Sequence, residues 1–195
     1  MKKAFIATAI AATFVTPQVF AQTKNFEGFS LTGSLNMASS TTEVTSTIFN
    51  GSNTESAQNF SLQGQYTVAA SPSFVLGLGL GLNVGELKAG TLTSTVAVKQ
   101  KTGASFYISP GLVLSEKALV YGKLASISGI FETTASSTLV NGVGVGLGFQ
   151  TFINSNVFLQ VEAMQNQYAD RAFTAFSEID KNKSTVLSLG LGYKF

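Results

Sequence analysis

Lys123 and Glu162 are charged residues that fall inside long stretches of otherwise uncharged, alternating sequence. An ammonium and a carboxylate that lie close together can pair, and pairing offsets part of the free-energy cost of removing either charge from water. We predict that these two groups form an ion pair in a hydrogen-bonded polar core; the alternative, in which each contacts water separately, stays open. The same core is predicted to include Gln160, Asn166, Gln63 and Tyr107.

Catalytic and metal-binding chemistry are disfavoured. The chain has no histidine and no cysteine, so the usual general base, thiol nucleophile and soft metal ligands are missing. The carboxylates of the long connections are scattered: Glu43, Glu55, Asp170, Glu178 and Asp180. Runs of glycine follow a G-x-G-x-G spacing with no helix after them, which does not fit a phosphate-binding loop. We expect no enzyme activity, no cofactor and no metal.

Eight segments alternate apolar residues with small or polar ones, which is the period of a β-strand. In the last of them, Thr185–Phe195, one face carries Leu187, Leu189, Leu191, Tyr193 and Phe195. The segments are joined alternately by short and long connections. The short ones are residues 70–73, 115–118 and 152–156, and the long ones are residues 38–57, 86–95, 130–139 and 169–182. A soluble β-sandwich has no reason to sort its loops in this way, whereas outer-membrane barrels have short periplasmic turns and long external loops.

The predicted fold is therefore all-β: one eight-stranded, antiparallel, up-and-down transmembrane barrel. Lys123 should face the interior, which sets the register of residues 119–129.

Inward glycines should leave room for bulkier residues across the lumen. Pro110 lacks an N–H, so we expect a bulge or a local break there. Outward aromatics are predicted to form a girdle near the short turns: Phe29, Tyr66, Phe74, Phe149, Tyr193 and Phe195.

Residues 1–21 have the form of a cleavable signal peptide, with Lys2 and Lys3 before a short apolar run and small residues near Ala21. The apolar run is too short for a spanning helix. Residues 22–195 would then form the barrel domain.

Without Lys2 and Lys3, ten of the twelve basic residues remain to balance ten acidic ones. A neutral chain without a basic cluster argues against a nucleic-acid partner.

The chain resembles the small eight-stranded outer-membrane proteins: OmpX-like barrels, the transmembrane domain of OmpA and opacity-type porin-family proteins. The resemblance is carried by residues 120–124, 142–149, 159–162 and 189–195. It implies a location in the outer membrane of a Gram-negative bacterium. It also implies that the terminal face ending at Phe195 acts as a membrane-insertion signal.

The leading functional prediction is a structural, adhesin-like role with four exposed loops. The alternative is a narrow, porin-like channel for small solutes, and an enzyme would have to act on a lipid without histidine. Expected partners are outer-membrane lipids and lipopolysaccharide, the outer-membrane assembly machinery, periplasmic chaperones and a surface ligand bound by the loops. We expect a monomer and no cofactor.

Overall fold

The computed structural model describes residues 23–45, 50–92, 96–132, 137–169, 171–173 and 178–195. A single 3-10 turn, η1 (Thr23–Asn25), precedes the strands. The strands are β1 (Gly28–Thr45), β2 (Asn50–Ser71), β3 (Phe74–Leu92), β4 (Val96–Val113), β5 (Ala118–Glu132), β6 (Ser137–Phe152), β7 (Val157–Tyr168), β8 (Arg171–Phe173) and β9 (Glu178–Lys194). Among these residues no helix is long and apolar enough to cross a membrane.

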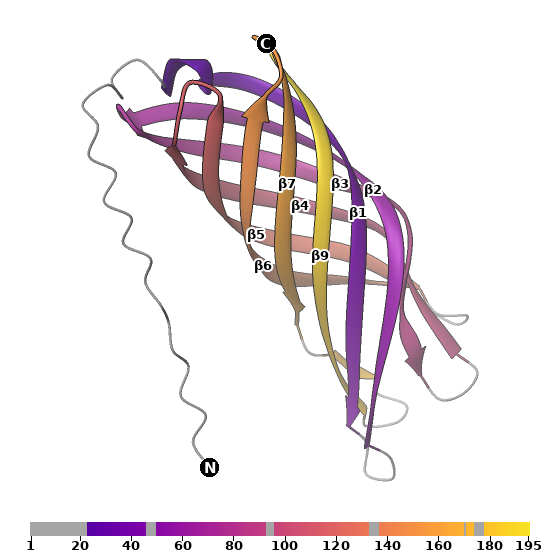
Figure 1. Cartoon of the computed structure of the whole chain (residues 1–195). Helices are drawn as coiled ribbons and strands as arrows, with labels where there is room; N and C mark the ends of the chain where they lie inside the picture. Colours follow the sequence, from indigo (N-terminus) through magenta and orange to yellow (C-terminus); the bar gives the residue numbers. More distant parts are fainter. Residues whose placement is uncertain (1–22, 46–49, 93–95, 133–136, 170, 174–177) are drawn as a thin grey trace, which may run out of the picture.

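Each strand pairs antiparallel with the next, and β9 pairs with β1 from Ser30↔Lys194 to Thr45↔Ile179, which closes the sheet (Figure 1). The eight long strands form the wall, and the three-residue β8 lies beside β9 alone. The predicted closed eight-stranded barrel is therefore confirmed. The connections β2–β3, β4–β5 and β6–β7 and the start of β1 lie at one end, here called the short-turn end. The opposite end is the long-hairpin end.

The pairing registers also give the tilt of the strands. One circuit of paired outward residues runs through Phe29, Tyr66, Leu78, Ile108, Leu124, Val145, Gln165 and Thr185 to Ser39. The circuit leaves β1 at Phe29 and returns ten residues further along the same strand. Ten residues correspond to about 33 Å along the strand and eight strand spacings to about 38 Å around the wall, so the strands tilt by roughly 40°.

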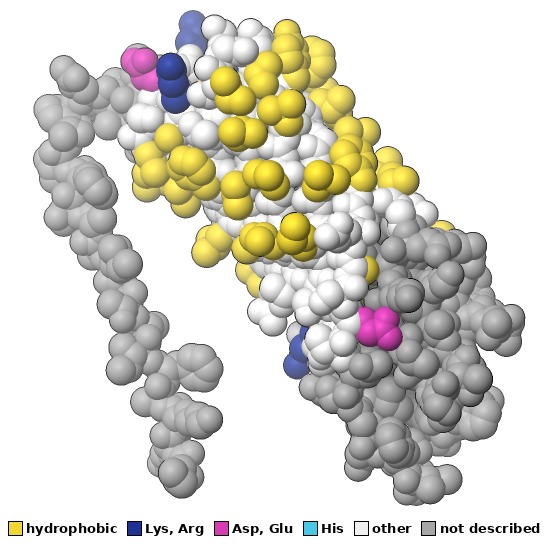
Figure 2. Space-filling view, turned by 45° about the vertical axis from the view of Figure 1, so that its right-hand side comes forward, with side chains coloured by type: hydrophobic (Ala, Val, Ile, Leu, Met, Phe, Trp, Pro, Cys, Tyr) yellow, Lys and Arg dark blue, Asp and Glu magenta, His cyan; other side chains and the backbone are white. Residues whose placement is uncertain are grey.

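The outward face is apolar over the middle of the wall. Leu35 is 69% exposed and its paired neighbour Leu189 is 59% exposed. From Leu189 the apolar row continues through Val161, Phe149, Val120, Leu112 and Phe74. Figure 2 shows hydrophobic side chains spread over the wall between charged groups at its ends. Soluble monomers rarely expose an apolar surface this continuous, so hydrocarbon is its natural cover.

The six girdle aromatics all lie exposed on the outward face. The Phe195 ring lies 5.7 Å from that of Phe29 and 5.0 Å from that of Tyr193, measured between centroids.

The interpretation of residues 119–129 is also right. Tyr121, Lys123 and Ala125 are buried inside the barrel, and Ser126 is exposed on the outward face.

The assignment of the long connections to loops is largely wrong. Within residues 38–57, β1 and β2 stay paired up to Thr45↔Asn50, and residues 86–92, 130–132, 137–139 and 178–182 are also strand. Thr favours strands, but outside the hydrocarbon layer the outward face need not be apolar, so no apolar alternation is required. The hydrophobic period therefore stops at the membrane boundary although the strand continues.

Pro110 interrupts one ladder without shifting it. On the β4–β5 side, pairing is recorded at Ile108↔Leu124 and resumes at Gly111↔Tyr121 in the same register. On the β3 side Pro110 remains paired with Leu76. The expected local break is therefore present, and the expected bulge is not. A missing N–H removes a hydrogen bond, but it adds no residue to the strand.

Candidate functional site in the barrel interior

Lys123 and Glu162 meet inside the barrel. The Lys123 Nζ lies 2.7 Å from Glu162 Oε2, and the two side chains are only 5% and 4% exposed. They come from β5 and β7, which are separated by β6. Their paired neighbours on β6 are Gly146 and Gly148, which contribute no side chain between them. Two glycines thus allow charges from non-adjacent strands to reach each other.

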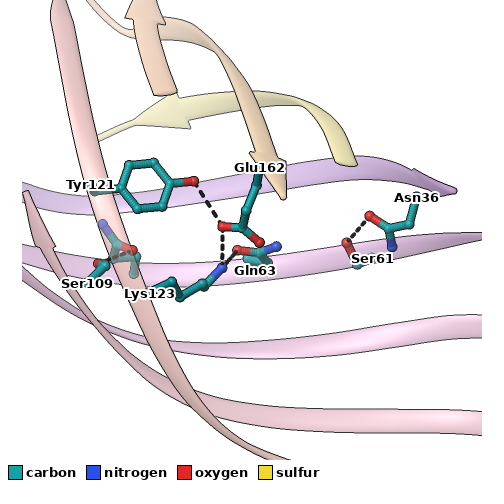
Figure 3. Close-up of polar contacts among 8 residues, drawn as sticks. Asn36, Ser61, Gln63, Ser109, Tyr121, Lys123 and Glu162 are labelled. Carbon is teal, nitrogen blue, oxygen red and sulfur yellow. Dashed lines mark hydrogen bonds and ion pairs between the residues drawn. The ribbon is translucent and has the colours of Figure 1, made fainter. Parts of the chain in front are cut away.

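Further polar and aromatic groups surround the ion pair (Figure 3). Tyr121 donates its hydroxyl proton to Glu162 Oε2 at 2.9 Å. Lys123 donates to Gln63 Oε1 at 2.7 Å. The same ammonium lies 3.9 Å from the centroid of the Tyr107 ring, a cation–π contact. Strands β2, β4, β5 and β7 are therefore linked through one buried charge cluster, which consists of Gln63, Tyr107, Tyr121, Lys123 and Glu162.

Two of the predicted core residues lie elsewhere. Gln160 is buried on β7 two residues from Glu162, and no hydrogen bond recorded among the described residues links it to the charge cluster. Asn166 lies nearer the long-hairpin end, where its Nδ2 donates to Ser184 Oγ at 3.5 Å. The buried Oδ1 of Asn166 has no protein partner among the described residues. Tyr121 was not predicted as part of this core, although it lies two residues before Lys123 on the same face.

An apolar plug fills the interior at the short-turn end. It consists of Phe26, Val75, Val113, Leu119, Tyr121, Phe152 and Phe158. Phe26 precedes β1 and packs on Phe152 with 5.3 Å between ring centroids, and Phe152 lies 5.6 Å from Phe158. Asn25 anchors this segment by donating to the Glu116 carbonyl at 3.0 Å. The plug was not predicted from the sequence, because Phe26 and Phe152 lie outside the alternating segments.

A cavity of about 70 Å³ lies beyond the charge cluster, toward the long-hairpin end. Its polar lining includes Asn36, Asn59, Ser61, Gln63, Asn83, Ser105, Asn166, Ser184 and Ser188. At about 10–15 Å³ per molecule, the space suits on the order of five waters. Asn36 donates to Asn59 Oδ1 at 2.7 Å and accepts from Ser61 at 3.3 Å, so part of this lining is already satisfied internally.

The inward glycines receive neighbouring side chains from the adjacent strands rather than from across the lumen. A Cβ at Gly79 would collide with the Tyr107 ring, one at Gly148 with the Tyr121 ring and one at Gly192 with the Phe158 ring. Each pair is a direct partner on adjacent strands. The prediction that the glycines leave room was right, but the source of the bulky partner was wrong.

In the described part of the chain, no side chains are assembled into a metal site. No group of three or more acidic, histidine or cysteine side chains comes together there. Asp170 and the side chains of Glu43, Glu178 and Asp180 lie outside the described residues.

The predicted insertion-signal residues form one exposed outward row on β9: Leu187, Leu189, Leu191, Tyr193 and Phe195.

A closed sheet with an apolar exterior and a filled polar interior defines an integral outer-membrane β-barrel. A family model described as outer membrane protein beta-barrel domain matches residues 6–195, and the chain belongs to this family. Its location is therefore the bacterial outer membrane. No curated protein matches the sequence.

Several solved structures are similar to this chain. Ail, the attachment invasion locus protein of Yersinia pestis, in complex with the heparin analogue sucrose octasulfate, has a TM-score of 0.52 at 16% identity, covering 86% of this chain and 99% of its own. Neisserial surface protein A has a TM-score of 0.45 at 17% identity, covering 87% and 100%. The outer membrane protease OmpT of Escherichia coli has a TM-score of 0.49 at 11% identity, covering 86% and 97%.

Proposed function

We propose that the protein is a non-enzymatic, non-conducting barrel that presents paired strands outside the membrane for surface interaction. In this architecture short turns face the periplasm and long connections face outward. Residues 1–21, which lie outside the described part, would direct export. The β9 row ending at Phe195 would be read by the assembly machinery and its chaperones, and the product would be a monomer surrounded by lipid and lipopolysaccharide.

The observation that carries this proposal is the continuation of β1, β2 and β9 beyond the apolar belt. Met37 is the last apolar outward residue of β1 with a described side chain, and pairing continues to Thr45 with both neighbours. Eight further residues extend a strand by about 26 Å. Thr41 and Thr54 are joined by a hydroxyl hydrogen bond of 3.1 Å on this extension. A paired sheet holds a binding surface in place better than a loop would.

One edge of the extension is open. Pairing of β2 with β3 begins only at Phe60↔Val84. Just beyond it, β3 has a register shift against β4 after Val84, and Gly85 has a φ of 117°, a left-handed value suited to a bulge. Among the described residues, Asn50–Asn59 therefore pair with β1 and with no strand on the other side. Such an edge can accept an extended segment of a partner as an added strand.

The channel alternative is disfavoured by the interior. The charge cluster crosses the middle of the barrel, and the apolar plug fills its short-turn end. The polar cavity is the feature that favours a pore. A planar-bilayer recording would decide between the two: we expect no discrete steady openings from the wild-type protein, and regular openings would overturn the non-conducting assignment.

The surface role is tested with a shortened hairpin. Replacing Thr42–Asn53 by Asn-Gly joins the directly paired Thr41 and Thr54 through a two-residue turn. Cells displaying this variant should adhere to polystyrene coated with unfolded serum albumin, which offers extended segments for strand addition, no better than cells without the protein, at equal amounts in the outer membrane. Undiminished adherence of the variant would contradict the proposal.

A pair of proline variants isolates the open edge. Successive N–H groups point to opposite sides of a strand, so of Ser56 and Ala57 one donates toward β1 and the other toward the open edge. Ser56→Pro and Ala57→Pro should therefore differ: one weakens the barrel, and the other folds normally but loses adherence. Normal adherence of the well-folded variant would show that strand addition is not the binding mode.

A further inference from the structure

The outward surface of β5, β6, β7 and β9 forms a groove of about 370 Å³ near the long-hairpin end. Its lining separates by chemistry. Leu124, Val143 and Val145 on β5 and β6 supply aliphatic side chains, and Gln165, Gln167 and Lys183 on β7 and β9 supply two amides and an ammonium. An amphipathic groove on the membrane-facing wall suits a ligand that is itself amphipathic.

The tilt of the strands determines which part of the groove lies deeper in the membrane. The paired row Thr185–Gln165–Val145–Leu124 continues around the wall to Phe29 in the short-turn girdle. A row that ends at the far girdle descends by about 3 Å at each strand. Gln165 therefore lies farther outward than Val145, and Lys183 farther outward than Val143. The groove has its polar groups at headgroup level and its aliphatic groups in hydrocarbon.

Lys183 carries the charge of this groove. Its side chain is exposed, and the ion pair recorded among the described residues, Lys123–Glu162, does not involve it. At headgroup level the amides of Gln165 and Gln167 can donate hydrogen bonds to oxygen atoms of a bound lipid. A lysine at the membrane surface attracts anionic lipid by about 1 kcal/mol. One cation beside two amide donors matches a phosphate group next to sugar or ester oxygens.

We propose that this groove binds a phosphorylated lipid of the outer leaflet. The phosphate contacts the Lys183 ammonium and the amides of Gln165 and Gln167. The acyl chains lie along Leu124, Val143 and Val145. The barrel would therefore hold a particular lipid at one position on its circumference, in addition to the general annulus.

A second outward groove provides an internal comparison. It lies across β2, β1 and β9 at the same end, measures about 710 Å³, and is lined in part by Met37, Ser39, Ser56, Gln58, Thr185 and Leu187. It is larger, but none of its lining residues is charged. If size and apolar surface alone governed lipid retention, this groove would be the stronger site. If phosphate recognition governs it, the Lys183 groove is stronger.

The test is a lipid-binding titration of the folded, full-length barrel in neutral detergent, read by native mass spectrometry. The probes are phosphorylated lipid A, dephosphorylated lipid A and inorganic phosphate. Wild type should bind phosphorylated lipid A about fivefold more tightly than K183Q does, and K183Q should lose most of the preference for the phosphorylated form over the dephosphorylated one. Val145→Gln should also weaken lipid binding, since it wets the aliphatic wall.

Matched controls separate this site from general charge effects. K117Q removes an exposed lysine in the turn between β4 and β5, and Gln58→Ala alters the uncharged groove; both should bind as wild type does. Equal binding by K183Q and wild type would overturn the proposal, as would an equal loss in K117Q. Full displacement of the lipid by inorganic phosphate at matched concentration would identify a simple anion site and would also overturn it.

Discussion

The Tyr121 ring occupies the space that a side chain at position 148 would fill. The two residues are direct partners on β5 and β6, and a Cβ built on Gly148 collides with the ring. This placement directs the Tyr121 hydroxyl across β6 to Glu162 on β7. The position of the buried carboxylate therefore depends on a glycine that makes no polar contact through a side chain.

Gly148→Ala should destabilise the barrel by about 1–3 kcal/mol, because the added methyl group displaces the Tyr121 ring from a filled interior. The measurement is urea unfolding of protein refolded into lipid vesicles. Gly64→Ala is the matched control: a Cβ there meets the Phe29 ring at an ordinary 3.5 Å. Equal stability of Gly148→Ala and wild type would show that the ring is not held in this position.

The ion pair predicts strong coupling between its two members. Lys123→Met or Glu162→Gln alone should each cost about 3–5 kcal/mol, since each leaves its partner buried without its counterpart. The double variant should cost clearly less than the two single changes added together. Unfolding free energies of the four proteins give the coupling directly, and a value of zero would mean that the two groups act independently.

Phe26→Ala should destabilise the barrel by about 3 kcal/mol by opening a cavity in the apolar plug. Phe26 is only 5% exposed although it precedes the first strand. Lys24→Ala changes an exposed neighbour, whose carbonyl rather than side chain accepts from Lys194, and should stay within about 0.5 kcal/mol of wild type. If both variants matched wild type in thermal and urea unfolding, the plug would have no part in stability.

Depth in the membrane should determine how well arginine is tolerated on β9. Leu189→Arg places a charge in the middle of the apolar row and should cost about 2–4 kcal/mol, whereas Thr185→Arg near the headgroups should cost about 0–1 kcal/mol. Vesicle refolding and unfolding titrations measure both. An equal effect at the two positions would contradict the placement of the hydrocarbon boundary.

The sequence predicted those parts of the fold that lipid imposes. Where one face meets hydrocarbon, alternation is obligatory, so the inward phase of Lys123 and the outward row ending at Phe195 could be read directly. Beyond Met37 the outward positions with described side chains, Ser39 and Thr41, are no longer apolar, so the alternation lapses and paired strand was taken for loop. Hydrophobic period reports the environment of a strand, and it reports pairing only indirectly.

Within the site, the contact between Lys123 and Glu162 could be predicted, because both residues face inward and lie at similar heights along the barrel axis. The contribution of Tyr121 could not be predicted in this way, because it depends on which strand neighbour lacks a side chain, and the contribution of Phe26 could not be predicted either. Gly148 admits Tyr121 only through a register that the sequence does not state. Phe26 reaches the interior from outside every alternating segment, so no periodic signal could place it.

The composition of the plug has a consequence for the order of assembly. Phe26 comes first in the chain, yet its seat is built from side chains of β3 through β7. Phe26 can therefore dock only after most of the barrel wall has formed. Although the segment before β1 comes first in the chain, its packing into the interior is a late step of assembly.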